Sequence, residues 1–548
     1  MTITSEETTK DGNRGGEGKS SSSLVAAGIL LSRLSGLVRE GVFSNYFGTS
    51  LYADVFRAAV RMPNSLQNLL GEGTLSASFI PVYSELLEQG REEEAGKTAG
   101  AILGLLTAAA AALALIGIAL APVLVRILSP GFEGERRTLA IEAVRIIFPM
   151  TGFLVLAAWA LGVLNSHRKF FLPYVAPVLW NGAMIATLFL LGGELSLNRL
   201  VIALCWGALV GGILQFAIQL PSVLRLERRL RPSFNLGLPP VREAVQNAGP
   251  AIVGRGVVQL SGYLDLILAS LLAAGAVATI GYAQTLYMLP VSLFGMSVAA
   301  AELPELSRQR SGSTEELRAR TVAGLERIAF YVVPSLVAFV ALGDVIVAAL
   351  YQRGEFERTD TLLVYFTLLG FSIGLIASTA TRLFSSTFFA LRDTRTPARF
   401  AILRVIIAGT LGFVLMVQFE SLELLGVGPG VFGNITLEGR SLGAVGLATG
   451  SGIAAWVEWT MLRRRLRQRI GPVGARLPKV ARMFAAGLAA ACAGWGIRLL
   501  VEGLSPILQA AFILTAFGVV YFAVAALLGL AEARTLMSRV AAMARRKT

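Results

Sequence analysis

Residues 32–81 carry many charges inside segments that are otherwise apolar enough to cross a bilayer. An Arg or Asp at the centre of a membrane helix costs roughly 2.5–3.5 kcal/mol on insertion scales. Ionisable groups that stay at this depth usually face a wet cavity or the interior of a helix bundle. We therefore expect the first two helices to line a polar chamber. The charged residues are Arg33, Arg39, Glu40, Asp54, Arg57, Arg61 and Glu72.

The composition indicates an all-α polytopic membrane protein. Of the 548 residues, 54% are hydrophobic and 15% charged, with a mean hydropathy of +0.66, whereas soluble domains carry roughly 25% charged residues. The net charge of +14 is spread over short loops between apolar runs. This distribution is typical of cytoplasmic loops, and it lacks the basic face of a soluble nucleic-acid-binding domain, so we expect no nucleic-acid partner.

The apolar runs predict about fourteen transmembrane helices of about 20 residues each. We expect an N-terminal bundle of about six at 24–232, a C-terminal bundle of about six at 233–470, and two extra helices at 471–531, an arrangement typical of alternating-access transporters. Residues 1–23 are polar and predicted to be a disordered tail, and 532–548 a basic tail. With the N-terminus inside, roughly 32 Lys and Arg residues fall in inside loops and about 7 outside, so both tails are predicted to be cytoplasmic.

The second span is over-long and contains helix breakers. Pro63 removes a helix hydrogen bond, and Gly71 and Gly73 loosen the following turns. Exposed backbone within a bilayer is tolerated only against protein or a water-filled cavity. We therefore expect this break to lie against the chamber, and a further kink at Pro290 in span 8.

Arg33 and Arg39 in span 1 are candidates for binding an anionic substrate group, because a guanidinium suits phosphate. The alternative is that both snorkel to the cytoplasmic interface. In span 2, Asp54, Arg61 and Asn64 are further candidates. Asp54 has an alternative role as an acid in the first turn of the helix, and Asn64 has one as a helix cap. Glu72 is the last candidate site residue of this region.

In span 7, Arg255, Gln259 and Asp265 are unlikely neighbours of lipid, because each is polar and lies mid-span. They either line the chamber or include an internal Arg–Asp pair, and Asp265 is also a candidate cation ligand. Spacing assigns no role to Arg382 in span 10 or Arg404 in span 11.

No motif in the sequence indicates an enzyme or a bound cofactor. The single histidine, His167, cannot form a zinc site. The two cysteines, Cys205 and Cys492, lie in apolar runs and predict neither a disulfide framework nor a metal pair. There is no ATP-binding G-x-x-x-x-G-K-[ST] loop, no H-E-x-x-H and no G-x-S-x-G elbow.

Four motifs stand out: S-R-L-S-G-L-V-R-E, A-D-V-F-R-A-A-V-R-M-P-N and G-E-G-T-L-S-A-S-F-I-P-V-Y near the N-terminus, and F-F-A-L-R-D-T-R-T-P at 388–397. With these motifs the sequence resembles the MurJ (MviN) family of lipid II flippases, in the MOP (MATE-like) transporter superfamily. The resemblance implies movement of lipid II, the undecaprenyl-pyrophosphate-linked precursor of peptidoglycan, from the inner to the outer leaflet of the bacterial cytoplasmic membrane. It also implies a cationic cavity formed by spans 1, 2, 7 and 8 and a lipid-tail groove formed by spans 13 and 14.

The family's span-1 arginines match Arg33 and Arg39, and its span-2 acid matches Asp54. We hypothesise that Arg255 replaces an arginine that many members carry at the start of span 8. Positions where this chain lacks the charge found in many members are Gln67, Gln284, Thr285 and Met288.

The resemblance leaves the energy source open. Some members bind sodium between a span-7 acid and polar groups of span 11. Asp265 could supply the acid, but span 11 offers only Thr410 and the cationic Arg404, which disfavours sodium coupling. Coupling to the membrane potential supplies about 2.3 kcal/mol per charge per 100 mV.

Alternative functions are a flippase for another polyprenyl-linked glycan, a MATE-like drug exporter, or a transport-inactive membrane scaffold. An exporter of cationic drugs would need acids in the chamber, whereas spans 1 and 2 are richer in arginine. As a lipid II flippase the protein would serve cell wall biogenesis and cell shape, with lipid II, membrane lipids and the peptidoglycan synthesis machinery as partners. We expect a monomer, because transporters of this plan carry the pathway within one chain.

Overall fold

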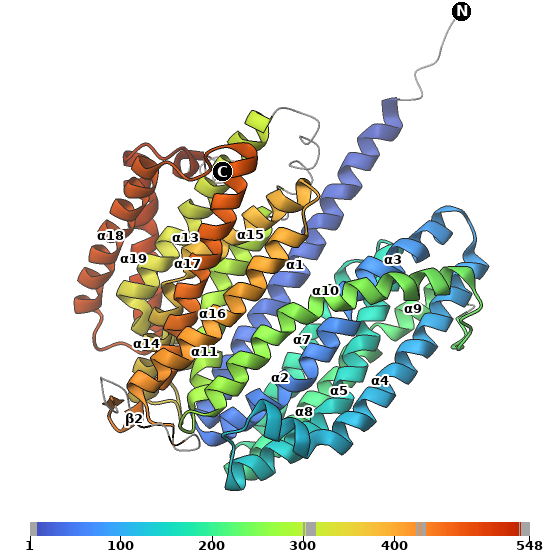
Figure 1. Cartoon of the computed structure of the whole chain (residues 1–548), viewed down its shortest axis with the longest axis horizontal. Coiled ribbons are helices and arrows are strands. Elements are labelled where there is room, and N and C mark those ends of the chain that lie inside the picture. Colours follow the sequence, from blue (N-terminus) through green and yellow to red (C-terminus); the bar gives the residue numbers. More distant parts are fainter. Residues whose placement is uncertain are drawn as a thin grey trace, which may run out of the picture. The chain divides into compact units, whose positions relative to one another are not determined.

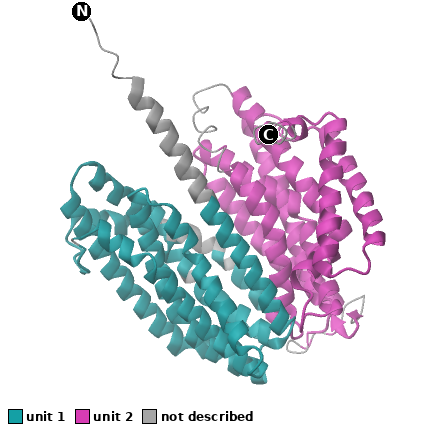
Figure 2. Ribbon diagram, turned by 180° about the vertical axis from the view of Figure 1, so that it is seen from behind, with its two compact units in different colours: residues 1–267 teal, residues 268–548 magenta. Residues whose placement is uncertain are grey.

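The computed structural model describes residues 8–228, 230–299, 302, 314–422, 426, 428, 435–535 and 538. The chain divides into two compact units, residues 1–267 and 268–548 (Figure 2). The boundary falls inside a helix, later than the predicted boundary at 232. The reason is that Val241 and Ala244 are buried in the hydrophobic core of unit 1.

Unit 1 is entirely helical in its described part, and Figure 1 shows its long helices. Its helices are Thr8–Phe47 (α1), Leu51–Leu70 (α2), Glu72–Glu88 (α3), Glu92–Leu128 (α4), Gly134–Ser166 (α5), Phe171–Val175 (α6), Pro177–Leu191 (α7), Leu197–Ala217 (α8), Leu220–Leu226 (α9) and Pro239–Ser270 (α10), the last of which continues into unit 2.

Unit 2 is also a helical bundle, with one short antiparallel hairpin between two of its helices. Its elements are Ala276–Pro290 (α11), the π-helical Val291–Met296 (η1), Thr314–Tyr351 (α13), Arg358–Ser372 (α14), Leu375–Ala390 (α15), Arg395–Phe419 (α16), Thr436–Leu437 (β1), Arg440–Ser441 (β2), Gly443–Ile470 (α17), Leu477–Leu500 (α18) and Pro506–Leu527 (α19).

Helix α5 forms the centre of unit 1. It packs against α2, α3, α4 and α8, and Trp159 in its second half is fully buried beside Phe79 and Tyr83 of α3. From residue 146 to 164 the helix is apolar on all sides, and such a segment belongs in the middle of a bundle. The position of α5 therefore follows from its sequence.

Helix α17 has the corresponding role in unit 2, where it packs against α14, α15 and α16. Glycines permit this close packing. A Cβ atom on Gly450 would lie 2.4 Å from the backbone nitrogen of Gly412 in α16, and one on Gly452 would lie 2.6 Å from the carbonyl oxygen of Gly370 in α14. Small residues let helix backbones approach in this way in membrane proteins.

Nine helices of the described part are long and apolar enough to cross a membrane, or ten if the bent pair α14 and α15 is one span. The predicted polytopic, all-α architecture is confirmed, but the count of about fourteen is not. The predicted spans without an apolar match correspond to α1, α2 with α3, α10 and α17. These helices are less apolar because they contain charges or many glycines, and they include the helices that carry the candidate site residues.

The predicted break in the second span lies at Gly71, between α2 and α3. A Cβ atom there would lie 2.4 Å from the carbonyl oxygen of Gln67. Pro63 is accommodated within α2. Unit 2 contains two further helix distortions. Helices α14 and α15 bend by 44° at a short break, and the π-helical η1 directly follows Pro290. Proline and π-helical turns are common causes of helix distortion.

Helix α1 begins at Thr8, whereas residues 1–23 were expected to be disordered. Residues 8–23 therefore differ from the prediction. Extending an existing helix is much easier than nucleating one, so a polar segment can continue the apolar helix that follows it. Residues 1–7 and most of the predicted tail at 532–548 lie outside the described residues.

Candidate functional site

The centre of the candidate site is a cluster of three charged side chains, Arg39, Glu40 and Arg57, which we call the α1–α2 charge cluster. Arg39 Nη2 donates to Glu40 Oε1 at 2.5 Å, and Arg57 Nη2 donates to Glu40 Oε2 at 2.6 Å. Glu40 is buried, with 8% of its surface exposed. One carboxylate thus binds two guanidinium groups from different helices, and the cluster keeps a net positive charge.

Aromatic rings support both arginines of the cluster. The guanidinium of Arg39 lies 5.1 Å from the ring centroid of Trp180 in α7, and that of Arg57 lies 5.3 Å from Phe43 in α1. Such stacking holds a guanidinium in a fixed orientation while leaving its outer N–H groups accessible. Arg33, two turns earlier on α1, is exposed.

Asp54 lies in a different environment from that of the α1–α2 charge cluster. It is fully buried in the first turn of α2, and its Oδ2 accepts a hydrogen bond from Arg136 Nη2 of α5 at 2.6 Å. The Arg136 guanidinium also lies 3.9 Å from the centroid of Phe132. This ion pair joins α2 to α5 within the core of unit 1, so the structure gives Asp54 a structural partner.

A second polar contact joins α2 to α10. Arg61 Nη2 lies 3.9 Å from Asp265 Oδ2, and both side chains are partly exposed. Tyr263 donates a hydrogen bond to the carbonyl oxygen of Met62 at 2.8 Å. The guanidinium of Arg61 therefore lies beside the carboxylate of Asp265, which was the predicted cation ligand.

Two more candidates have described side chains. Gln259 on α10 is half-buried. The Oδ1 atom of Asn64 is buried without a hydrogen-bond partner in the described part of the chain, and a buried unpaired carbonyl is costly unless water or a ligand satisfies it. The side chains of Glu72 and Arg255 lie outside the described residues.

Three members of these ion pairs, Glu40, Arg57 and Arg136, were missed as site residues, although the sequence held a signal for one of them. Asp54, Arg57 and Arg61 are spaced three and four residues apart and share one face of α2. That spacing pointed to Arg57. Arg136 had no such signal, because its partner is 82 residues away in sequence.

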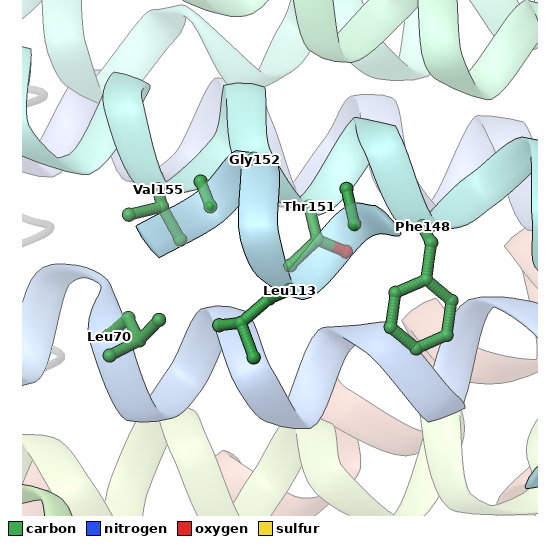
Figure 3. Close-up of a pocket in the computed structure, with 8 residues that line it drawn as sticks. Leu70, Leu113, Phe148, Thr151, Gly152 and Val155 are labelled. Atoms are coloured by element: carbon green, nitrogen blue, oxygen red, sulfur yellow. The ribbon is translucent and has the colours of Figure 1, made fainter. Parts of the chain in front are cut away.

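Within the described ranges, no group of three or more His, Cys, Asp or Glu side chains is placed to hold a metal ion. A small pocket between α2, α4 and α5 is almost entirely apolar (Figure 3). Its one polar lining atom, Thr151 Oγ1, has no hydrogen-bond partner among the described residues. Without a charged group, this pocket is unsuited to an anionic headgroup.

The F-F-A-L-R-D-T-R-T-P motif forms the turn between α15 and α16. Asp393 accepts hydrogen bonds from the Thr396 amide at 2.9 Å and hydroxyl at 2.7 Å, and lies 2.6 Å from Arg469 at the end of α17. Burial opposes ionisation of Asp393, but these hydrogen bonds and Arg469 outweigh it and lower the pKa of the carboxyl. The motif therefore ties three helices of unit 2 together.

Comparison with known proteins identifies the family to which the chain belongs. The family model described as lipid II flippase MurJ matches residues 43–523. Lipid II flippase MurJ of Burkholderia cenocepacia is 34% identical over 385 residues, covering 69% of this chain and 74% of that protein. The probable lipid II flippase MurJ of Rhizobium meliloti is 30% identical over 489 residues, covering 88% and 86%.

Solved structures confirm the fold. A lipid II flippase MurJ in an inward closed conformation matches with a TM-score of 0.73 at 22% identity, covering 92% of this chain and 98% of that one. An inward-facing multidrug resistance MATE transporter of the MOP superfamily matches with a TM-score of 0.63 at 20% identity, covering 80% and 95%. The predicted MOP-type, MATE-like fold is thus confirmed.

Proposed function

Because this chain belongs to the lipid II flippase MurJ family, we propose that it moves lipid II from the inner to the outer leaflet of the cytoplasmic membrane by alternating access. The single observation that carries this function is the match of the family model to residues 43–523. The protein then serves peptidoglycan synthesis as a multi-pass transporter of the bacterial inner membrane, with both termini in the cytoplasm.

The α1–α2 charge cluster is the proposed binding site for the pyrophosphate of lipid II. Its two guanidinium groups offer several N–H donors in the planar geometry that suits phosphate oxygens. Glu40 holds Arg39 and Arg57 within hydrogen-bonding distance of one carboxylate before substrate arrives. The same carboxylate competes with the substrate for these two guanidinium groups, so the pyrophosphate has to displace it. Arg33, exposed on the same helix, adds positive charge along the approach.

Many family members carry a charged pair where this chain has Gln284 and Thr285. Arg255 is proposed to supply the missing cationic group. Its position on α10 is about two turns before Tyr263 and about three turns before Asp265, and these two residues contact α2. In transport assays we expect Arg255→Ala to abolish flipping at normal expression. Undiminished flipping would remove Arg255 from the proposed site.

Energy for transport is proposed to come from the membrane potential rather than from sodium. The support is that Asp265, the candidate cation ligand, already has Arg61 at 3.9 Å. A fixed guanidinium competes with a monovalent cation for the same carboxylate. We further propose that the protein works as a monomer and associates with the peptidoglycan synthesis machinery.

The decisive experiment is depletion and rescue in a strain whose own lipid II flippase can be switched off, with lipid II in the outer leaflet as the readout. We expect the wild-type chain to restore flipping and Arg39→Ala to fail at equal membrane expression. Arg399→Ala is the matched control, because Arg399 is exposed in the first turns of α16. If well-expressed wild-type protein does not move lipid II, the substrate assignment is wrong.

A further inference from the structure

Arg382 lies in the middle of α15, far from either end of a membrane helix. It is about 12 Å along the helix axis from Ala390, at 1.5 Å per residue, in a bilayer whose apolar core is about 30 Å thick. Its side chain is exposed, and it has no hydrogen bond or ion pair with any residue that the structure describes. A guanidinium at this depth is costly against lipid, so it marks a wet surface.

The surroundings of Arg382 are polar and come from four helices of unit 2, which Figure 1 labels as α11, α15, α16 and α17. Tyr287 of α11 donates a hydrogen bond to Ser378 of α15 at 2.6 Å, and Ser378 lies one turn before Arg382 on the same face. Arg404 of α16 forms an ion pair with Glu458 of α17 at 3.1 Å. Arg382 lies close enough to Arg404 to be repelled by it and close enough to Glu458 to be attracted by it.

The charges of this group do not balance. Glu458 is almost completely buried and its carboxylate is engaged by Arg404. Arg382 is therefore a second positive charge beside an ion pair that is already complete. Because Arg382 is exposed and no described carboxylate bonds to it, its N–H groups are available to an anionic ligand. An anionic ligand at this wet surface would balance the second positive charge.

We propose that Arg382, with Arg404 and the hydroxyl of Tyr287 beside it, forms a subsite for an anionic oxygen group of the transported headgroup. This inference rests on the proposed function and extends it, because the subsite is on unit 2 and is separate from the α1–α2 charge cluster on unit 1. The ligand chemistry is a carboxylate or a phosphate, both of which bind a guanidinium through two parallel hydrogen bonds. In lipid II the peptide supplies carboxylates and the lipid carrier supplies the pyrophosphate.

Binding to the purified full-length protein in nanodiscs tests the subsite with two probes, lipid II and undecaprenyl pyrophosphate. The variants are Arg382→Gln, which removes the charge, and Arg382→Lys, which keeps it. Arg399→Gln is the matched control, since it removes an exposed arginine from unit 2 outside the subsite. Arg39→Ala tests the cluster of unit 1 in the same assay.

We expect Arg382→Gln to weaken binding of lipid II by about tenfold or more, the usual effect of losing a charge-assisted hydrogen bond. We expect Arg382→Lys to recover most of the loss and Arg399→Gln to bind like wild type. If undecaprenyl pyrophosphate loses affinity equally, the ligand is the pyrophosphate, and if only lipid II does, it is a peptide carboxylate.

The thermal unfolding midpoint separates this role from a structural one. Removing an uncompensated charge should leave the midpoint of Arg382→Gln unchanged or higher, whereas a structural arginine would lower it. The subsite is wrong if Arg382→Gln binds both probes like wild type while Arg39→Ala loses lipid II. If wild-type protein binds neither probe, the proposed function and the subsite fall together.

Discussion

The carboxylate of Asp54 lies 2.6 Å from the guanidinium of Arg136, and both side chains are almost completely buried in unit 1. Removing one partner of a buried ion pair leaves an uncompensated charge, which typically costs about 3–5 kcal/mol. We therefore expect Asp54→Ala to lower the free energy of unfolding in detergent by about that amount.

The double variant Asp54→Leu with Arg136→Leu provides the control, because it removes both charges and fills the space with apolar groups. We expect it to be more stable than Asp54→Ala. If both variants lose transport while Asp54→Ala keeps wild-type stability, Asp54 acts on substrate and its structural role is wrong.

Glu40 competes with substrate for Arg39 and Arg57. In Glu40→Gln the cluster gains a net positive charge, so we expect the Kd for lipid II to fall by about tenfold and the transport rate to fall as release slows. Binding in nanodiscs and translocation in proteoliposomes measure the two effects. Glu93→Gln, in a surface pair with Lys97 on α4, should change neither. A weaker affinity in Glu40→Gln would mean that Glu40 mainly positions the arginines.

Asp393 makes the stability of unit 2 depend on pH. Its pKa in the folded protein lies below the unfolded value of about 3.9, so its stabilisation is complete above that pH and is lost as the pH falls through the folded-state pKa. We expect Asp393→Ala to lower the free energy of unfolding by about 1 kcal/mol at pH 7, and we expect this difference from wild type to shrink as the pH falls and Asp393 becomes protonated. Glu355→Ala, an exposed acid, should match wild type at both values.

Gly450 sets the spacing between α16 and α17. A methyl group there would lie 2.4 Å from backbone of Gly412, and such overpacking typically costs about 1–3 kcal/mol. Gly450→Ala should therefore lower the unfolding midpoint. Gly518→Ala has open space around it and should raise stability by up to about 1 kcal/mol through helix propensity. Equal midpoints for the two variants would contradict the packing of these helices.

Transport should not require sodium. In proteoliposomes we expect the same initial rate of lipid II translocation in sodium and in potassium buffers of equal ionic strength, and a lower rate when the membrane potential is collapsed. Asp265→Asn should leave the rate insensitive to sodium. A rate that rises with sodium in wild type but not in Asp265→Asn would restore Asp265 as a cation ligand.

Much of the architecture was predictable because it depends on apolarity and helix breakers. The polytopic fold, the break near Gly71 and the distortion after Pro290 all follow from local sequence. The span count was not confirmed, because polar helices such as α1 and α10 gain their stability from neighbours rather than from apolar composition.

The partners within the candidate site were only partly predictable. The charge on Arg39 identified it as a candidate, and its bond to Glu40 is local to α1, but the bond from Arg57 to Glu40 depends on the orientation of α1 against α2. Asp54 was recognised as unusual, yet its partner Arg136 lies on a helix whose contact with α2 no local pattern reveals. Which charged side chains pair across helices depends on how the helices pack, and the hydrophobic periodicity of a single helix does not reveal this.

The distance in sequence between Asp54 and Arg136 has a consequence for biosynthesis. The two residues are separated by 82 positions, and chains are synthesised at about 5–20 residues per second. For roughly 4–16 s, therefore, α2 exists with an acid whose cation has not yet been made. Glu40 differs, because its partner Arg39 directly precedes it and Arg57 follows after only 17 positions. The ion pair that joins α2 to α5 can therefore form only after α5 has been synthesised.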